Sequence, residues 1–269
     1  MNPFGKPIIG QYIPGESPVH RMDPRAKLVF VFVYLTAVFW VRVPAAYLLF
    51  ILVNLIGVSL SGVSWRLLLR GMKPILWLIA VTALLHVFLT KGGDLWWQWG
   101  PISIHEQGVK QAVWMSVRFL LLITMATLLT LTTTPVDLTE GMERLMKPLK
   151  RIGVPVHELA LMMSIALRFI PTLWEEAEKI MRAQMARGAD FESGGMLGRA
   201  KSFIPVLIPL FVSALKRAED LAMAMEARAY RGGEGRTRLR ELRFSRLDWA
   251  LWAVMGGLII GVWVLGRVG

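Results

Sequence analysis

Five long apolar stretches constrain the fold of this chain more than any other feature of its sequence. They cover residues 28–41, 43–60, 74–90, 112–131 and 249–265. A helix needs roughly 20 apolar residues to cross a bilayer, and most of these stretches approach that length. The chain is also 55% hydrophobic, with a mean hydropathy of +0.50, whereas about 45 to 50% is usual in water-soluble domains. The sequence therefore predicts an all-α, polytopic membrane protein with about five transmembrane helices.

The first apolar stretch is the shortest and has charged residues at both ends. Arg25 and Lys27 precede it, and we expect their charges to reach the membrane surface while their aliphatic stems stay among apolar groups. Arg42 and Pro44 separate it from the second stretch. This spacing predicts a tight turn between two neighbouring spans.

The distribution of basic residues orients the predicted spans, because loops rich in lysine and arginine normally lie in the cytoplasm. Residues 1–27 carry four basic against two acidic residues, and residues 61–73 carry three basic and no acidic residues. Residues 91–111 are balanced in charge and contain three tryptophans, which is typical of the outer membrane surface. The N-terminus is therefore expected in the cytoplasm and the C-terminus outside. The formal net charge of +12 is interpreted as a topology signal, not as a nucleic-acid-binding surface.

The longest segment between apolar stretches is predicted to form a second unit of the protein. Residues 132–247 contain 19 basic and 14 acidic residues, which places them in the cytoplasm. Loops longer than roughly 15 residues usually have structure or function of their own. The predicted organisation is a cytoplasmic N-terminal segment (1–27), four transmembrane helices (28–131), a cytoplasmic helical unit (132–247) and a fifth transmembrane helix (248–269).

The pattern inside residues 132–247 is helical. A helix start is predicted at Thr134-Pro135 with Asp137, and a stop at Gly153. An apolar helix should follow over residues 158–174, and Pro171 is expected to bend or interrupt it. Because it also contains a charged arginine, this helix was not expected to be one of the transmembrane spans.

A short near-repeat ends in an arginine between small residues. Residues 176–188 and 217–229 match at an offset of 41, and they close with Ala186-Arg187-Gly188 and Ala227-Arg228-Ala229. Arginine in the last turn of a helix is common, because the unpaired carbonyl groups there carry partial negative charge. The repetition favours a second interpretation, in which a slender helix end enters a groove on another protein and its guanidinium pairs with a carboxylate. Since alanine replaces glycine at position 229, we expect the second helix to run on to Gly232.

The methionines on the predicted helices of this unit can be interpreted in two ways. They can fill a core, which is the commoner use, or they can form an adaptable surface that accepts more than one partner. The residues concerned are Met162, Met163, Met181, Met185, Met223 and Met225.

The sequence offers little that would support catalysis. It contains no cysteine, no phosphate-binding G-x-x-x-x-G-K-[ST] loop and no H-E-x-x-H zinc motif. No acidic residue lies inside the five apolar stretches, although ion-coupled carriers commonly use such carboxylates. We therefore expect no catalytic residue and no metal site. The alternative is a self-contained membrane carrier or enzyme with His86, Arg118 and His157 in its site.

Three motifs resemble one transporter family over essentially the whole chain. They are residues 8–15 with 20–28, the run Ala166-Leu167-Arg168-Phe169-Ile170-Pro171, and the run Ala183-Gln184-Met185-Ala186-Arg187-Gly188. In these runs the chain resembles the transmembrane T component of energy-coupling factor transporters. Such a component is a non-catalytic scaffold in the plasma membrane of prokaryotes.

The resemblance implies partners and roles for particular residues. A T component joins two cytoplasmic ATP-binding-cassette ATPases, which bind ATP and Mg, to a substrate-binding S component that captures a vitamin or another micronutrient. Its X-Arg-X motifs end coupling helices and dock on the ATPases, which corresponds here to Ala186-Arg187-Gly188 and Ala227-Arg228-Ala229. Residues 132–247 would then be a cytoplasmic coupling domain, with the methionine-bearing face meeting the S component.

Overall fold

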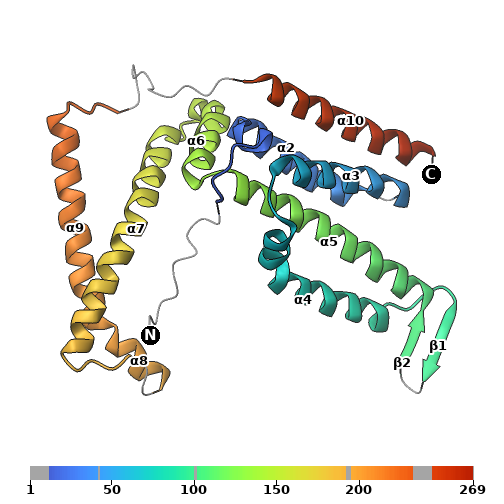
Figure 1. The fold of residues 1–269 in the computed structure, drawn as a ribbon, viewed down its shortest axis with the longest axis horizontal. Coiled ribbons are helices and arrows are strands. Elements are labelled where there is room, and N and C mark those ends of the chain that lie inside the picture. Colours follow the sequence, from blue (N-terminus) through green and yellow to red (C-terminus); the bar gives the residue numbers. More distant parts are fainter. Residues whose placement is uncertain (1–11, 42, 100–101, 192–194, 233–243, 269) are drawn as a thin grey trace. The chain divides into compact units, whose positions relative to one another are not determined.

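The computed structural model describes residues 12–41, 43–99, 102–191, 195–232 and 244–268. These residues are mainly helical and belong to two compact units (Figure 1). The first unit combines Met1–Leu145 with Glu241–Gly269, and the second comprises Met146–Arg240. The predicted all-α class is confirmed.

The first unit contains the helices formed by most of the apolar stretches. They are α1 (Pro18–Arg21), α2 (Pro24–Trp40), α3 (Pro44–Ser61), α4 (Trp65–Leu89), α5 (Glu106–Thr132), most of α6 (Pro135–Met146) and α10 (Arg246–Val268). Prolines open α2, α3 and α6, where a missing backbone donor costs nothing because the first N–H groups of a helix have no intrahelical partner. Gly62, with φ of 67°, ends α3 in the left-handed conformation. The turn predicted at Arg42 lies outside the described residues.

Among the described residues, four helices are long and apolar enough to cross a membrane: α3, α5, α10 and α7 (Val156–Ala186). A fifth candidate is α4, whose halves Trp65–Lys73 and Ile75–Leu89 meet at an angle of 61°. The number of candidates agrees with the predicted number of spans. With 17 residues, α2 is slightly shorter than the roughly 20 of a typical span and is not among them, while α7 continues through Pro171 and joins the candidates by its length and composition. Of the two predicted effects of Pro171, an interruption of the helix does not occur.

The core of the first unit is dense and includes a buried polar cluster. Tyr34 and Phe50 are almost fully buried, and their rings meet edge to face at 5.1 Å. The Tyr34 hydroxyl donates to the carbonyl oxygen of Phe50 (3.2 Å), and the Asn54 amide donates to the Tyr34 hydroxyl. These bonds link α2 to α3 inside the apolar core, where unsatisfied polar groups would be costly.

A β-hairpin occupies the segment that was expected to be a loop. Its strands β1 (Leu95–Trp99) and β2 (Ile102–His105) are antiparallel, with Trp97 opposite Ile104. The strands satisfy each other's backbone groups. The side chains of Trp96 and Trp97 are 61% and 49% exposed, so the hairpin carries the tryptophans that were expected at the outer membrane surface.

The second unit is a helical hairpin with short additions. It contains the 3-10 helix η1 (Lys147–Ile152), α7, the short α8 (Met196–Ser202) and α9 (Ile204–Ala227).

The predicted start of α6 is confirmed, because the Thr134 hydroxyl accepts from the Asp137 N–H at 3.1 Å and donates to the Asp137 carboxylate at 2.7 Å. The predicted stop is confirmed as well, since Gly153 ends η1 with φ of 87°.

Candidate functional site

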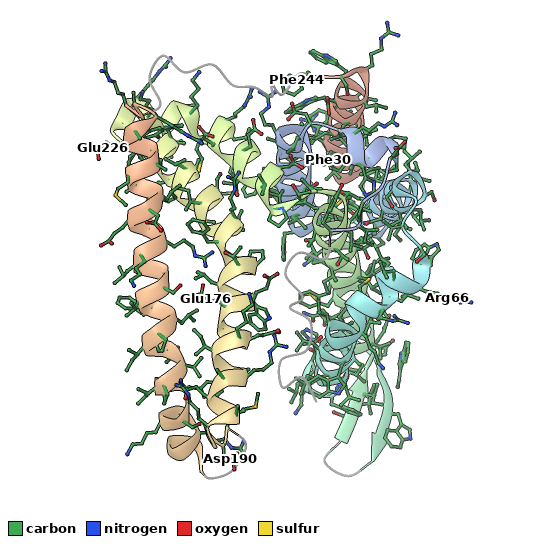
Figure 2. The ribbon with its side chains drawn as sticks, turned by 60° about the vertical axis from the view of Figure 1, so that its left-hand side comes forward. Phe30, Arg66, Glu176, Asp190, Glu226 and Phe244 are labelled. Carbon is green, nitrogen blue, oxygen red and sulfur yellow. The ribbon has the colours of Figure 1, made fainter. Side chains whose placement is uncertain are left out.

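The two arginine motifs end the two long helices of the second unit, and these helices pack against each other in antiparallel directions. Three contacts fix the direction: Gln184 with the Pro205 carbonyl (3.4 Å), Glu176 with Arg217 (2.7 Å) and His157 with Tyr230 (3.4 Å). In Figure 2, Asp190 and Glu226 mark opposite ends of the pair. The two arginine-bearing ends therefore point in opposite directions along it.

The end of α7 has a defined hydrogen-bonded cap. The helix ends at Ala186, Arg187 is its C-cap residue, and Gly188 follows with φ of 90°. The Gly188 N–H donates to the Met185 carbonyl (3.0 Å), and the Ala189 N–H donates to the Gln184 carbonyl (3.0 Å). These two bonds form a Schellman motif, which satisfies the last carbonyl groups and turns the chain away sharply.

The end of α9 has the same cap without a glycine. The helix ends at Ala227, Arg228 is its C-cap residue, and Ala229 adopts φ of 52°. The Ala229 N–H donates to the Glu226 carbonyl (2.8 Å), and the Tyr230 N–H donates to the Met225 carbonyl (3.0 Å). The expectation that this helix runs on to Gly232 is therefore wrong. The hydrogen bonds of the cap hold Ala229 in a left-handed conformation, although this conformation costs an alanine about 1 kcal/mol.

Both tips present their arginine to the surroundings. We name them the α7 tip (Ala186-Arg187-Gly188) and the α9 tip (Ala227-Arg228-Ala229), and all six residues are exposed. Among the described residues, neither guanidinium has an ion-pair or hydrogen-bond partner. With 24 residues in α9 and a rise of 1.5 Å per residue, the tips lie roughly 36 Å apart. Each tip thus offers an unpaired planar cation on a narrow helix end, separate from the other.

A polar contact joins the two helices between the tips. Arg217 pairs with one Glu176 oxygen at 2.7 Å, and the Ser213 hydroxyl donates to the other. Glu176 and Arg217 occupy equivalent positions of the near-repeat, 41 residues apart. The sequence analysis missed this pair, although the repeat offset brings the two residues into correspondence.

The six methionines separate into buried and exposed groups. Met181 is only 3% exposed and serves the packing of the second unit, and Met225 is half-buried. Four side chains are 40 to 60% exposed: Met162, Met163, Met185 and Met223. Only four of the six methionines are therefore exposed enough to contact a partner.

Two residues of the alternative carrier or enzyme site, His86 and Arg118, lie apart from each other within the first unit. His157 belongs to the second unit, whereas His86 and Arg118 lie in the first. Gly108 packs against the His86 carbonyl, and Arg118 lies ten residues farther along α5, about 15 Å away. Among the described residues, no group of three potential metal ligands occurs.

Each of these three residues has a structural contact instead. Arg118 donates to the Tyr47 hydroxyl at 2.8 Å and to the Val41 carbonyl at 3.3 Å, which ties α5 to the α2–α3 connection. The ring of His86 contacts the Thr90 hydroxyl at 3.5 Å. Together with the His157–Tyr230 contact, these partners favour structural roles.

A buried carboxylate network in the first unit was missed by the sequence analysis. Asp248 is fully buried; its oxygens accept from the Asp23 N–H (2.8 Å), the Ser245 N–H (2.6 Å) and the Ser245 hydroxyl (2.9 Å). Burial raises the pKa of Asp23, but the hydrogen bonds and positive charge of Arg25 outweigh it and hold that pKa below its usual range. The spacing Ser245-x-x-Asp248 is a capping-box signal that could have revealed the start of α10.

Lys27 is buried, so the prediction that it extends to the membrane surface is wrong. It is 5% exposed, and its ammonium group donates to the Thr132 carbonyl (3.0 Å) and the Thr133 hydroxyl (3.1 Å). The C-terminal end of a helix favours a cation, because its last carbonyl groups are unpaired. Lys27 thus fastens α2 to the end of α5.

Comparisons with known proteins agree over nearly the whole chain. The family model described as cobalt transport protein, CbiQ, matches residues 15–239. The energy-coupling factor transporter transmembrane protein EcfT of Brevibacillus brevis is 54% identical over 257 residues, which are 95% of this chain and 97% of the relative. The protein of the same description from Bacillus subtilis is 53% identical over 241 residues, covering 90% and 91% of the two chains. That from Clostridium kluyveri is 45% identical over 261 residues, covering 97% and 96%.

Proposed function

This chain belongs to the family of energy-coupling factor transporter transmembrane proteins, and we propose that it transmits ATPase motion to a substrate-binding S component. It is a multi-pass membrane protein and a transporter subunit. In the proposal, two ABC-type ATPases bind ATP and Mg and carry out hydrolysis, while this chain has no catalytic role. The transported substrate would be a vitamin or another micronutrient bound by the S component.

The main support for this proposal is the similarity between the α7 tip and the α9 tip. Both end in the same Schellman cap, and both expose one guanidinium between small residues. A planar guanidinium can bind a carboxylate through two parallel hydrogen bonds. Because the tips lie at opposite ends of the pair, roughly 36 Å apart, they suit two separate grooves better than one. Two ATPase subunits would supply two such grooves.

The packing between α7 and α9 supports a mechanical role. The Glu176–Arg217 ion pair and the Ser213 hydrogen bond connect the helices side by side. Movement of the docked ATPases would therefore be passed on by the pair as one body, as in other rigid-body switches. The exposed methionines of α7 and α9 would meet the S component and change its orientation, since methionine repacks readily against different partners.

The proposed arrangement places the second unit in the cytoplasm of a prokaryotic cell, where ATP is available. In this arrangement α7 is not a span, although it is long and apolar enough to cross a membrane. The N-terminus would also be cytoplasmic and the C-terminus outside. The excess of basic over acidic residues in residues 132–247, 19 against 14, supports this orientation.

A double charge reversal tests the docking of the tips. We expect Arg187→Glu with Arg228→Glu to abolish co-purification of the ATPases and substrate uptake, and to leave the amount of chain in the membrane unchanged. Removing one partner of a buried interfacial charge pair costs roughly 2 to 5 kcal/mol, so each single change should weaken assembly without abolishing it.

The matched control reverses two charges on the same helices away from the tips. Lys179→Glu with Lys216→Glu changes the net charge equally, and both side chains are exposed. This control should retain the ATPases and uptake. Normal complex yield and uptake in the tip variant would refute the proposal.

A further inference from the structure

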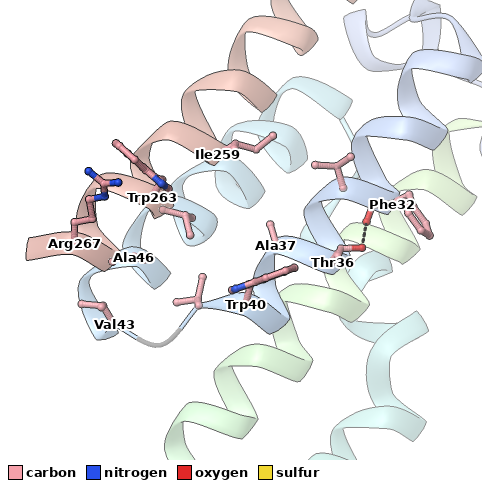
Figure 3. A pocket seen from close by; sticks show the side chains of 13 residues that line it. Phe32, Thr36, Ala37, Trp40, Val43, Ala46, Ile259, Trp263 and Arg267 are labelled. Carbon is pink, nitrogen blue, oxygen red and sulfur yellow. Dashed lines mark hydrogen bonds between the residues drawn. The ribbon is translucent and has the colours of Figure 1, made fainter. Parts of the chain in front are cut away.

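An apolar groove runs between α2 and α10 in the first unit and is closed at one end by the start of α3 (Figure 3). Its volume is about 760 Å³. Residues of both helices line it: Phe32, Thr36 and Trp40 from α2, and Ile259, Trp263 and Arg267 from α10. We call it the α2–α10 groove.

The long part of the groove offers no free polar group. Its one hydroxyl, that of Thr36, donates to the Phe32 carbonyl at 2.9 Å. The remaining side chains there are apolar, and Phe32 is 73% exposed. Because α10 is apolar enough to cross a membrane, the hydrocarbon chains of lipids can reach this part of the groove.

The end near the C-terminus of α10 has the opposite character. The Arg267 guanidinium lies 3.8 Å from the centroid of the Trp263 ring, and Trp40 is 76% exposed at the same end. Tryptophan is enriched at membrane–water interfaces, and long basic side chains near helix ends extend toward them. Arg267 is the only charged residue among those that line the groove, and no acidic residue is among them. The groove therefore has one cationic end and an apolar body.

We propose that the α2–α10 groove binds an anionic glycerophospholipid. One acyl chain lies along α2 and α10, and the phosphate of the headgroup pairs with Arg267. An amphiphile with a single negative end matches this distribution of charge. A helix of another protein fits less well, because its own apolar face would leave Arg267 without an anion.

The glycines of α10 allow a sharp test. A Cβ atom added at Gly266, which lines the groove, or at Gly257, which does not, would meet no atom within 4 Å. The first atom of a new side chain at either position therefore meets no protein atom. We expect Gly266→Leu to occupy part of the groove, and Gly257→Leu is its matched control. Arg267→Gln removes the charge and leaves the apolar body intact.

The experiment offers equal amounts of phosphatidylglycerol and phosphatidylethanolamine to the purified full-length chain in detergent and measures the retained lipid by native mass spectrometry. The wild-type chain should prefer phosphatidylglycerol about fivefold, the factor that corresponds to about 1 kcal/mol for one basic side chain at an anionic surface. Arg267→Gln should reduce the preference to about one. Gly266→Leu should lower retention of both lipids, and Gly257→Leu should behave like the wild type.

The location of the lipid is read out separately on the wild-type chain. Phosphatidylglycerol with a photoactivatable acyl chain should form adducts on α2 and α10, which keeps the proposal testable if a variant fails to fold. Equal retention of the two lipids by the wild type, unchanged retention by Gly266→Leu, or adducts confined to other helices would overturn the proposal. Displacement of the lipid by a second copy of the chain, seen as a dimer mass, would overturn it too.

Discussion

The two units of this protein differ in how they use their apolar residues. In the first unit, Tyr34, Val38 and Phe50 are at most 1% exposed and belong to a large core. In the second, the buried apolar side chains among the described residues are Val156, Ala160, Met181 and Val206, while Phe211 and Met223 are 65% and 60% exposed. Two helices cannot enclose a core of their own, and large exposed apolar surfaces usually mark interaction sites. The first unit thus has a large core of its own, whereas the described residues of the second unit bury few apolar side chains.

The largest expected effect concerns the buried carboxylate of the first unit. Asp248→Ala should lower the free energy of unfolding by about 3 kcal/mol, because three hydrogen bonds to Asp248 are lost and the Asp23 N–H is left buried without an acceptor. Denaturant titration of the chain in detergent measures the change. Asp220→Ala, at an exposed position of the second unit, is the control and should shift the free energy by less than about 0.5 kcal/mol. Equal effects of the two changes would contradict the distinction between the units.

The difference between buried and exposed apolar side chains can also be tested inside the second unit, with Met181 and Met223. Met181→Ala should lower the free energy of unfolding by about 2 kcal/mol, since Met181 is 3% exposed. Met223→Ala removes the same atoms from a side chain that is 60% exposed and should cost less than about 0.5 kcal/mol. The same change should weaken capture of the S component, measured by co-purification from the membrane. A large loss of stability from Met223→Ala would show that the second unit closes its own core.

The smallest expected effect sharpens the comparison of the two tips. Ala229→Gly should stabilise the α9 tip by about 0.5 to 1 kcal/mol, because glycine adopts a positive φ without strain, and Gly188→Ala should destabilise the α7 tip by a similar amount. Hydrogen exchange of the Tyr230 and Ala189 amides reports both changes. Co-purification of the ATPases should persist in each variant. Destabilisation by Ala229→Gly, or stabilisation by Gly188→Ala, would show that the caps are held by contacts outside their own backbone.

Local patterns predicted much of the fold and the position of both tips. The apolar run of residues 43–60 nearly coincides with α3, and that of residues 112–131 lies within α5. The stop signal at Arg187-Gly188 marked the end of α7, whereas the end of α9 at Arg228-Ala229 was not predicted, because the conformation of Ala229 did not follow from its residue type. Such features depend on neighbours within a few residues, which is why the sequence indicates them.

Contacts between distant parts of the chain could not be predicted in the same way. The bond between Asp23 and Asp248 joins residues 225 positions apart, and the bond from Lys27 to Thr132 joins residues 105 apart. Charged residues at the ends of apolar runs are normally exposed, so their burial becomes visible only when the helices are packed. The β-hairpin was missed because residues 91–111 were read by their charge and tryptophans instead of their pairing.

The antiparallel direction of α7 and α9 has a mechanical consequence. Arg217 lies 11 residues before Arg228 and 13 residues after Ile204, the first residue of α9, so the ion pair with Glu176 sits near the middle of the pair. If two docked ATPases move in opposite directions across the helix axis, the forces on the two tips act on opposite sides of this point. Together they form a torque. The helix pair would then turn about its centre instead of being pushed along its length, and a rotation at the tips would become a rotation of the surface offered to the S component.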